Sequence, residues 1–386
     1  MTRASSSVHS IDFRKLPPSI LAGERTLKIH RYGHPAARPK IYIQAALHSD
    51  ELPAALAAHH LIQLLDAAAD RGDILGQVIV VPLANPIGMG QMVSGSHIGE
   101  AELFSGRNFN RGWPDLSAGL EEAVSRRLTQ DAERNVAIIR EAIGEKLSAF
   151  RVTSEFAWLQ RELCQLAYDA DFVLDMHCDD DAVLHLYTMP QFWPDLADLA
   201  SDISAEACLL CDDSKSHCFD ETFSLPWTNL VKRIGGKVPV PYGCKTVTLE
   251  FRGQADVSDH LAAADAAGLF RFLQRRGAVV GSAPEVSRTA IEVGMLDAAD
   301  IVEAPAGGII AYHVRPGDRV KKGDVIAHLI DPGAHVSTGV RRAVTATVDG
   351  LVMSARRRKL VALGDYVVMI IGKESLPHRQ ERLMTD

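Results

Sequence analysis

Four residues of the chain have the types and the order that hydrolytic metal chemistry requires. His48 and Glu51 are three positions apart, and His177 and Glu250 follow later in the chain. Two imidazoles and a carboxylate suit Zn²⁺, which usually takes three protein ligands in a catalytic site and leaves one position for water. A further carboxylate can act as general base and then protonate the leaving amine. We therefore predict His48, Glu51 and His177 as metal ligands and Glu250 as the base.

The residues around His48 predict a turn between a strand and a helix. Residues 41–47 are apolar and partly β-branched, which indicates a buried strand. Residues 51–69 predict a helix with Ser49 or Asp50 as its cap. Open α/β sheets bind their ligands at such turns. Taken alone, this stretch favours a capping glutamate beside a structural histidine, so the interpretation as a metal site depends on the later residues.

Other segments predict alternating strands and helices. The predicted strands are 27–30, 76–83, 171–176 and 245–251, and the predicted helices are 118–149, 153–169, 194–211 and 258–275. This alternation predicts an α/β fold, with a mostly parallel central sheet flanked by helices. His48, His177 and Glu250 then fall at or near strand ends. The intervening residues 87–116 have little periodicity, and a loop of this length in a compact domain is usually functional or disordered.

The composition excludes some classes of protein. The 386 residues are 47% hydrophobic and 23% charged, as in an ordinary globular protein. A net charge of -8 argues against a nucleic-acid partner. No segment approaches the roughly 18 apolar residues of a membrane span, and the first residues lack the apolar core of a signal peptide. The six cysteines show no framework spacing, which favours a reducing, cytoplasmic setting.

Several motifs in this order resemble the succinylglutamate desuccinylase/aspartoacylase family of the zinc carboxypeptidase-like superfamily. The segments that carry the resemblance are Leu47–Glu51, Asn85-Pro86, Asn108–Arg111, Leu174–His177 and Thr248–Glu250. The resemblance implies a carboxypeptidase-like fold and one zinc ion per chain. It assigns His48, Glu51 and His177 as the zinc ligands and Glu250 as base and proton shuttle. Asp175 could support an imidazole ligand or bind backbone groups.

The same resemblance implies a binding site for a substrate carboxylate. The family's Asn-Arg pair, matched by Asn110 and Arg111, binds this carboxylate, and a planar guanidinium suits it physically. Arg107 is the only earlier arginine of this loop and could take the role of a second family arginine. Arg252, two residues beyond the predicted base, is an alternative anion contact.

A rival metal or redox site is the cysteine cluster in the middle of the chain. Cys208 and Cys211 have the Cys-x-x-Cys spacing, and His217 and Cys218 follow closely. Such a group could bind a structural zinc ion or form a redox pair. No second Cys-x-x-Cys motif exists, and the first two cysteines are predicted near a helix end. Buried free thiols are therefore the favoured interpretation.

The composition changes after Gly281, where short strands joined by Gly-Asp turns are predicted. A two-fold pattern here resembles the biotinyl/lipoyl-carrier β-barrel. A carrier needs a modified lysine at the hairpin between its halves, but residues 331–347 contain none. We predict a hydrolase domain over 1–281 and an all-β barrel over 282–386 without the modified lysine. The barrel could cover the active-site mouth or support homo-oligomers.

The leading functional prediction is a zinc-dependent deacylase that uses metal-activated water to cleave the amide bond of an N-acyl amino acid or related small carboxylate-bearing amide. A metallocarboxypeptidase acting on small peptides is the alternative with the same chemistry, because both reactions need a carboxylate clamp. A barrel that narrows access favours small substrates. The alternative of another class is a non-catalytic metal-binding or carrier protein, against which the missing lysine and the complete ligand set both argue.

Overall fold

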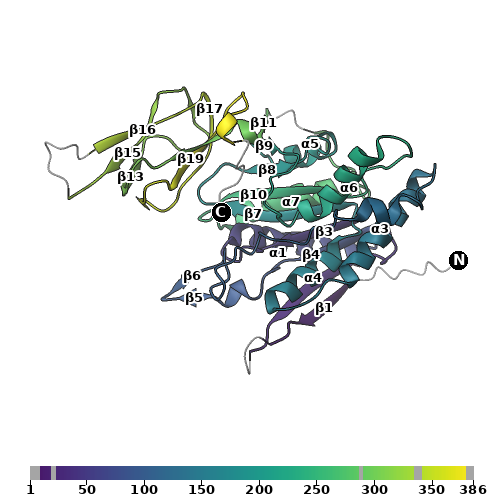
Figure 1. Ribbon diagram of the computed structural model, residues 1–386. Coiled ribbons are helices and arrows are strands. Elements are labelled where there is room, and N and C mark those ends of the chain that lie inside the picture. The colour runs from purple at the N-terminus through teal and green to yellow at the C-terminus, as the bar shows by residue number, and fades with distance from the viewer. Residues whose placement is uncertain (1–8, 19–22, 287–289, 334–340, 380–386) are drawn as a thin grey trace.

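A nine-stranded sheet forms the centre of the structure, a computed structural model that describes residues 9–18, 23–286, 290–333 and 341–379. Figure 1 shows this sheet with a smaller β-domain beside its β9–β11 edge. The strands of the large sheet, in spatial order, are β1 (His9–Lys15), β2 (Thr26–Tyr32), β4 (Gln77–Val81), β3 (Lys40–Ala45), β7 (Phe172–Asp179), β10 (Lys245–Gly253), β8 (His185–Thr188), β9 (Ala207–Leu210) and β11 (Glu292–Met295).

The parallel strands β4, β3, β7 and β10 carry the candidate site. Strands β1, β2 and β4 pair antiparallel, and β8 lies antiparallel to β10. All positions of β3 and β4 are buried, as expected for strands covered on both faces. Because the carboxyl ends of parallel strands meet at one edge, the turn after β3 and the last residues of β7 and β10 lie together there.

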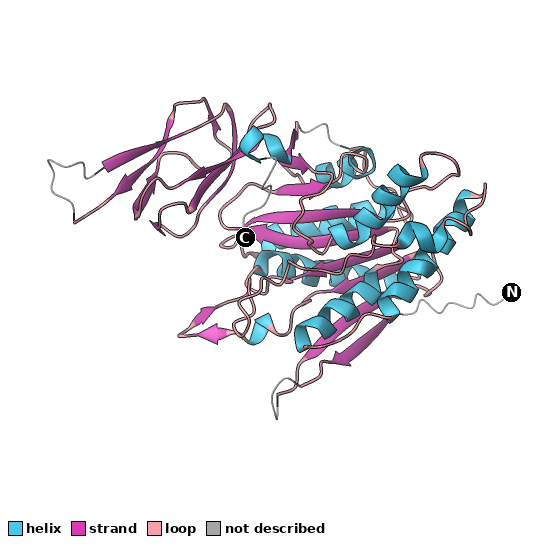
Figure 2. Cartoon of the chain, in the orientation of Figure 1, coloured by secondary structure: helices cyan, strands magenta, loops and turns pink. Residues whose placement is uncertain are grey.

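Helices cover both faces of the sheet, as Figure 2 shows in cyan. One face is covered by α1 (Leu52–Asp70), α5 (Trp193–Asp202) and α7 (Asp259–Arg275), and the other by α2 (Leu120–Val124), α3 (Ala132–Ser148), α4 (Glu155–Ala167) and α6 (Glu221–Ile234). Neighbouring residues of β3 point into different cores, since Ile43 packs with the first group of helices and Tyr42 with the second. The predicted α/β fold class is confirmed.

The start of α1 differs from the prediction. Glu51 is its N-cap residue, with φ -87° and ψ 70°, and no side chain caps the helix. The prediction of Ser49 or Asp50 as cap is therefore wrong. The physical reason is that the backbone turns one residue later, and the Glu51 carboxylate is bound by imidazoles instead of by the first-turn N–H groups. Pro53 occupies the first turn, where its missing N–H leaves no hydrogen bond unmade.

Two predicted helices are broken in the structure. The helix predicted over 194–211 ends at Asp202, and β9 follows after a turn in which Ser204 has a left-handed φ of 61°. Cys208 therefore lies in a buried strand and not near a helix end. The helix predicted over 118–149 is divided into α2 and α3, and the Asp131 side chain caps α3 by accepting from the Arg134 N–H. A cap in the middle of a periodic stretch ends one helix and begins another.

The smaller domain consists of antiparallel sheets, as predicted for the C-terminal barrel. In the described residues, one sheet has the strand order β12 (Ala299–Glu303), β19 (Tyr366–Ile371), β17 (Gly350–Ala355) and β14 (Arg319–Val320). The other sheet has the order β16 (Arg341–Thr345), β15 (Val325–Ile330), β13 (Gly308–Tyr312) and β18 (Leu360–Val361). The stretch 331–347, relevant to a carrier lysine, is only partly among the described residues. The boundary between 281 and 282 stays a prediction, and β11 extends the large sheet beyond it.

Among the described residues, no helix is long and apolar enough to cross a bilayer. All six cysteines are free thiols.

Candidate metal centre and active site

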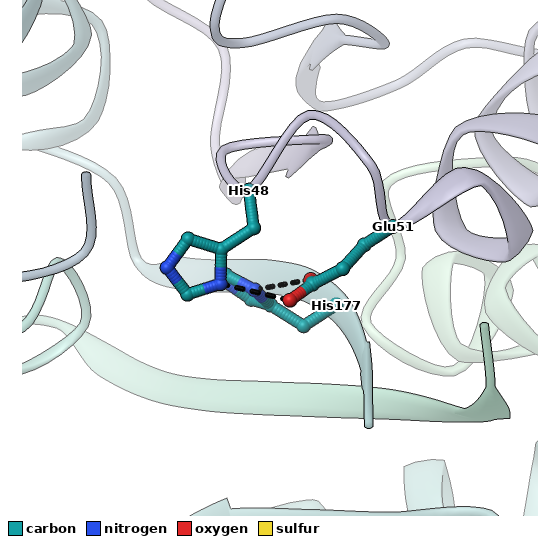
Figure 3. Close-up of side chains that lie close together, drawn as sticks. All are labelled: His48, Glu51 and His177. Atoms are coloured by element: carbon teal, nitrogen blue, oxygen red, sulfur yellow. Dashed lines mark hydrogen bonds and ion pairs between the residues drawn. The ribbon is translucent and has the colours of Figure 1, made fainter. Parts of the chain in front are cut away.

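The turn after β3 brings two of the predicted ligands to the third. Figure 3 shows the Glu51 carboxylate facing the rings of His48 and His177, with a dashed line to each. The Nδ1 atom of His48 lies 2.8 Å from one Glu51 carboxylate oxygen, and the Nδ1 atom of His177 lies 2.7 Å from the other. One ligand atom from each residue lies within 4.8 Å of the others, and no other such group of three occurs in the part of the chain that the structure describes.

The electrostatics of this group are those of a buried carboxylate between two bases. Burial alone would raise the pKa of Glu51, but the charges of His177 and His48 lower it to about 2. Burial would lower the pKa of His48, yet the Glu51 carboxylate raises it. His177 is also buried, and Asp175 and Glu51 raise its pKa well above the ordinary value. The ionised Glu51 carboxylate thus favours a positive charge beside it, either as a proton on the imidazoles or as a metal cation bound by them.

Each imidazole has a second partner that leaves Nδ1 facing the carboxylate. The Nε2 atom of His48 lies 2.9 Å from the Asn108 side-chain oxygen. The Nε2 atom of His177 lies 3.0 Å from an Asp175 oxygen, and the other Asp175 oxygen accepts a 2.9 Å hydrogen bond from Gln44. The Asn108 oxygen can hold the proton of His48 at Nε2, and the Asp175 carboxylate favours a proton at Nε2 of His177, which leaves each Nδ1 lone pair for a metal ion. The residues present therefore fit a zinc ion.

Asn108 is a residue to which the sequence analysis assigned no role. It lies in the Asn108–Arg111 segment that carries the family resemblance, which was the available signal. We expect Asn108→Ala to weaken metal affinity by about 10- to 100-fold, because the His48 ring loses the acceptor that sets its tautomer. Metal titration followed by competition with a chelator measures this. Ser105→Ala, in the exposed part of the same loop, is the control, and equal affinities of the two variants would contradict the assignment.

Glu250 lies beside His177 on the neighbouring strand. The two residues are in register across the parallel pair β10–β7, so their side chains share one face of the sheet. His185 is the register partner of Glu250 on the other side. Burial raises the pKa of Glu250 well above its ordinary value; His177 opposes this shift, and the Glu51 and Asp179 carboxylates add to it. A carboxylate with a raised pKa is suited to taking up a proton and releasing it again.

The Asn-Arg pair lies in the loop that carries Asn108. The Asn110 backbone N–H donates to the Asn108 side-chain oxygen at 2.8 Å, and the Asn110 side-chain oxygen accepts from the Phe219 N–H at 2.9 Å. Arg111 donates through Nη1 to the Asn110 carbonyl at 2.9 Å and is partly exposed. Through Asn108, this pair is connected to the His48 ring. The long loop, predicted to be either functional or disordered, therefore contacts the candidate metal group directly through Asn108.

The two other predicted anion contacts lie in different surroundings. The exposed Arg107 guanidinium stacks 5.2 Å from the centre of the Phe156 ring. Arg252 forms an ion pair with Asp265 of α7 and has a left-handed φ of 63°. In the described residues, neither guanidinium contacts the His48–Glu51–His177 group.

The long loop closes tightly against the turn that carries the ligands. Asn85 donates to the Leu47 carbonyl at 2.8 Å, and the Ser49 N–H donates to the Gly99 carbonyl at 3.1 Å. A Cβ atom on Gly99 would lie 2.1 Å from the Asp50 nitrogen, and one on Gly88 would lie 2.5 Å from the Ser49 hydroxyl oxygen. Both glycines therefore permit an approach that no side chain allows.

The rival cysteine cluster does not form a metal-ligand group in the described residues. Cys208 is buried in β9, and burial raises the pKa of its thiol. The Cys218 thiol donates to Asp220 at 3.0 Å. The cysteines are free thiols, in agreement with the favoured interpretation.

These features together define the class of the protein. A mostly parallel sheet with helices on both faces, and a His-Glu-His group at its carboxyl edge, is the architecture of carboxypeptidase-like hydrolases. Residues 37–276 match the family described as the succinylglutamate desuccinylase/aspartoacylase catalytic domain. The chain belongs to this family, whose members are deacylases and hydrolases.

Solved structures show the same fold over nearly the whole chain. A protein of Shewanella frigidimarina, named after the same family, has a TM-score of 0.84 at 22% identity, over 94% of this chain and 97% of that one. One from Shewanella amazonensis has a TM-score of 0.83 at 22% identity, over 94% and 98%. The product-bound ectoine utilization protein EutE (DoeB) of Ruegeria pomeroyi has a TM-score of 0.65 at 20% identity, over 95% of each chain. No curated protein matches the sequence.

Proposed function

We propose that this protein is a zinc-dependent hydrolase that cleaves the amide bond of an N-acyl amino acid or a related small amide with a carboxylate. The observation that carries the proposal is the Glu51 carboxylate within hydrogen-bond distance of two Nδ1 atoms, with the half-buried Glu250 on the adjacent strand. When bound, a single zinc ion supplies Lewis acidity that activates water and polarises the amide carbonyl. His48, Glu51 and His177 would hold it.

Glu250 moves the proton in this proposal. Its ionised carboxylate takes a proton from the attacking water, and the resulting carboxylic acid passes that proton to the leaving amine. The acidic surroundings of Glu250, including Glu51 and Asp179, stabilise its protonated form between these two steps. His185, in register beside it, is fully buried, and burial lowers the pKa of its imidazole to about 4, so it stays neutral at neutral pH.

Arg111 and Asn110 bind the substrate carboxylate in this proposal. The support is that Asn108 connects their loop to the His48 ring. A substrate whose carboxylate is bound by this loop would have its scissile amide at a defined distance from the metal ligands. We assign the main contact to Arg111 because it lies beside Asn110 in the loop that reaches the His48 ring, whereas neither Arg107 nor Arg252 contacts the ligand group in the described residues. A site that binds the substrate carboxylate in this way would select amino acids acylated at nitrogen, or the C-terminal end of small peptides.

Replacing Arg111 tests the carboxylate contact. We expect Arg111→Ala to lower kcat/KM by about 10- to 100-fold, mainly through KM, because a hydrogen bond to a charged group contributes about 1.5–3 kcal/mol. Arg111→Lys should recover part of this, since it restores the charge but not the planar fork. Steady-state kinetics with metal-loaded protein measures both. Arg107→Ala is the matched control, and a larger loss there than in Arg111→Ala would transfer the role to Arg107.

The experiment that tests the function combines metal analysis with a substrate panel. The panel should contain N-acyl amino acids of different acyl groups, N-succinylglutamate and N-acetylaspartate among them, and short peptides with free C-termini. Hydrolysis of the acyl amino acids with one zinc ion per chain supports the proposal. Hydrolysis of peptides alone would make the protein a metallocarboxypeptidase. Zinc binding without hydrolysis of any member would favour the non-catalytic alternative.

The free thiols agree with the predicted reducing, cytoplasmic setting.

A further inference from the structure

The barrel contacts the two loops that directly follow the strands of His177 and Glu250. Its strand β17 pairs antiparallel with the segment after β7, where Ala182 bridges Ser354. The Ala355 N–H donates to the Asp181 carbonyl at 2.8 Å, and the Val183 N–H donates to the Met353 carbonyl at 3.1 Å. The loop after β7 is thereby an additional strand partner of the barrel. Figure 1 shows β17 and β19 on the side of the barrel that faces the large sheet.

A buried serine of the barrel lies close to the last residue of β7, Asp179. The Ser354 hydroxyl is 1% exposed, hydrogen-bonds the Tyr366 hydroxyl, and faces the Asp179 carboxylate. Asp179 in turn connects the two loops. Its carboxylate accepts from the Asp180 N–H at 2.6 Å, and its carbonyl accepts from the Gln254 N–H at 3.0 Å. Ser354 therefore bridges the loop after β7 at Ala182, close to the residue that links the end of β7 to the end of β10.

The end of β10 is held from two sides. The strand is irregular between Glu250 and Gly253, and Arg252 in this irregular part pairs with Asp265 of α7. On the other side, the Arg357 guanidinium of the barrel donates to the Gln254 side-chain oxygen at 2.9 Å. The residues that follow Glu250 are thus contacted by α7 through Arg252 and by the barrel through the Gln254 side chain.

An apolar cluster stabilises the interface between the hydrolase part and the barrel. Val183, Ala207 and Leu209 of the hydrolase part pack against Leu351, Met353 and Ile371 of the barrel, and all six are at most 6% exposed. Burial of this kind excludes water from the seam and opposes separation of the two parts. Ser354 is buried beside this dry interface, whereas the Arg357 side chain is exposed at its margin.

We infer that the barrel is a positioning part of the active site, and that Ser354 and Arg357 are the positioning residues through which it acts. They hold the loops after β7 and β10, and so keep His177 and Glu250 in their mutual arrangement. This inference rests on the proposed function. It gives the domain a role that needs no modified lysine, and it assigns Arg252 to the support of the β10 end in place of substrate binding.

The test compares Ser354→Ala and Arg357→Ala in the full chain at equal metal occupancy. Each should lower kcat by about 10- to 100-fold with KM nearly unchanged, the effect that a displacement of about 1 Å can have on a reacting group. Ser354→Thr and Arg357→Lys, which restore the donors, should recover most of the rate. Arg358→Ala removes the same charge from the adjacent exposed position and should have the wild-type rate.

Hydrogen exchange supplies a readout that does not depend on activity. The N–H groups of Val183, Gln254 and Ala355 should exchange faster in Ser354→Ala and Arg357→Ala than in wild type and Arg358→Ala, because their hydrogen bonds open more often. Wild-type kcat in both alanine variants, or unchanged exchange at these amides, would overturn the inference. Absence of hydrolysis by the wild-type protein would overturn the proposed function instead, and the exchange experiment would still test whether the barrel holds the loops.

Discussion

Replacement of Glu250 by glutamine is expected to abolish turnover while the protein keeps its metal ion. The amide has nearly the shape of the carboxylate but cannot take a proton from water, so the loss should be at least about 10²- to 10⁴-fold in kcat. Glu250 is not one of the three predicted ligands, and the zinc content should remain at one ion per chain. Steady-state rates together with metal analysis of the same sample measure both quantities.

Glu303→Gln is a suitable control because it makes the same chemical change at an exposed strand position of the barrel. Its rate should equal that of the wild type. Hydrolysis by Glu250→Gln at the wild-type rate would exclude Glu250 as the base. Loss of zinc from this variant would indicate instead that Glu250 is a ligand.

Replacement of His177 or His48 by alanine is expected to remove both the metal and the activity. Two remaining ligands hold zinc poorly, so affinity should fall by more than the roughly 100-fold that loss of an outer hydrogen-bond partner causes. Metal binding also stabilises the fold, by about 2.7 kcal/mol when free metal is 100 times Kd. A chelator should therefore lower the apparent Tm of the wild type and leave that of His177→Ala unchanged.

His59→Ala serves as the control for this experiment, because His59 is exposed on α1 and hydrogen-bonds only Gln63 in the described residues. It should bind zinc and respond to the chelator as the wild type does. A His48→Ala protein with full zinc content would disprove the ligand assignment.

The core strands could be predicted because their chemistry is local. Strands β3, β4 and β7 each contain a short run of apolar, partly β-branched residues, and α7 has a regular amphipathic pattern, so each is recognisable from its own residues. Strand β1 was missed, because only one of its faces is partly covered and its sequence has no apolar run. The four residues of β8 are too few for a reliable pattern.

The site could be predicted in its residue types and order, but not in its supporting contacts. The hydrogen bond of His48 with Asn108 joins residues 60 positions apart, and neither sequence neighbourhood specifies it. The contact of Ser354 with Asp179 connects two domains and depends on how the barrel packs. Likewise, the pairing of Arg252 with Asp265 follows from the left-handed residue near the end of β10, which the sequence does not indicate. Such contacts arise from tertiary packing, which local patterns do not encode.

The close approach of Gly88 and Gly99 to the ligand turn divides the long loop into two regions with different tolerance to mutation. Alanine at Gly99 would meet the Asp50 backbone and alanine at Gly88 the Ser49 and Asn85 side chains, so random mutagenesis should recover few active variants at these positions, and fewest at Gly99. Farther along the loop, Leu103 and Phe104 are 53% and 99% exposed, and substitutions there should be accepted freely. A mutant library that must preserve the ligand turn can therefore vary residues 103–105 but should leave the two glycines intact.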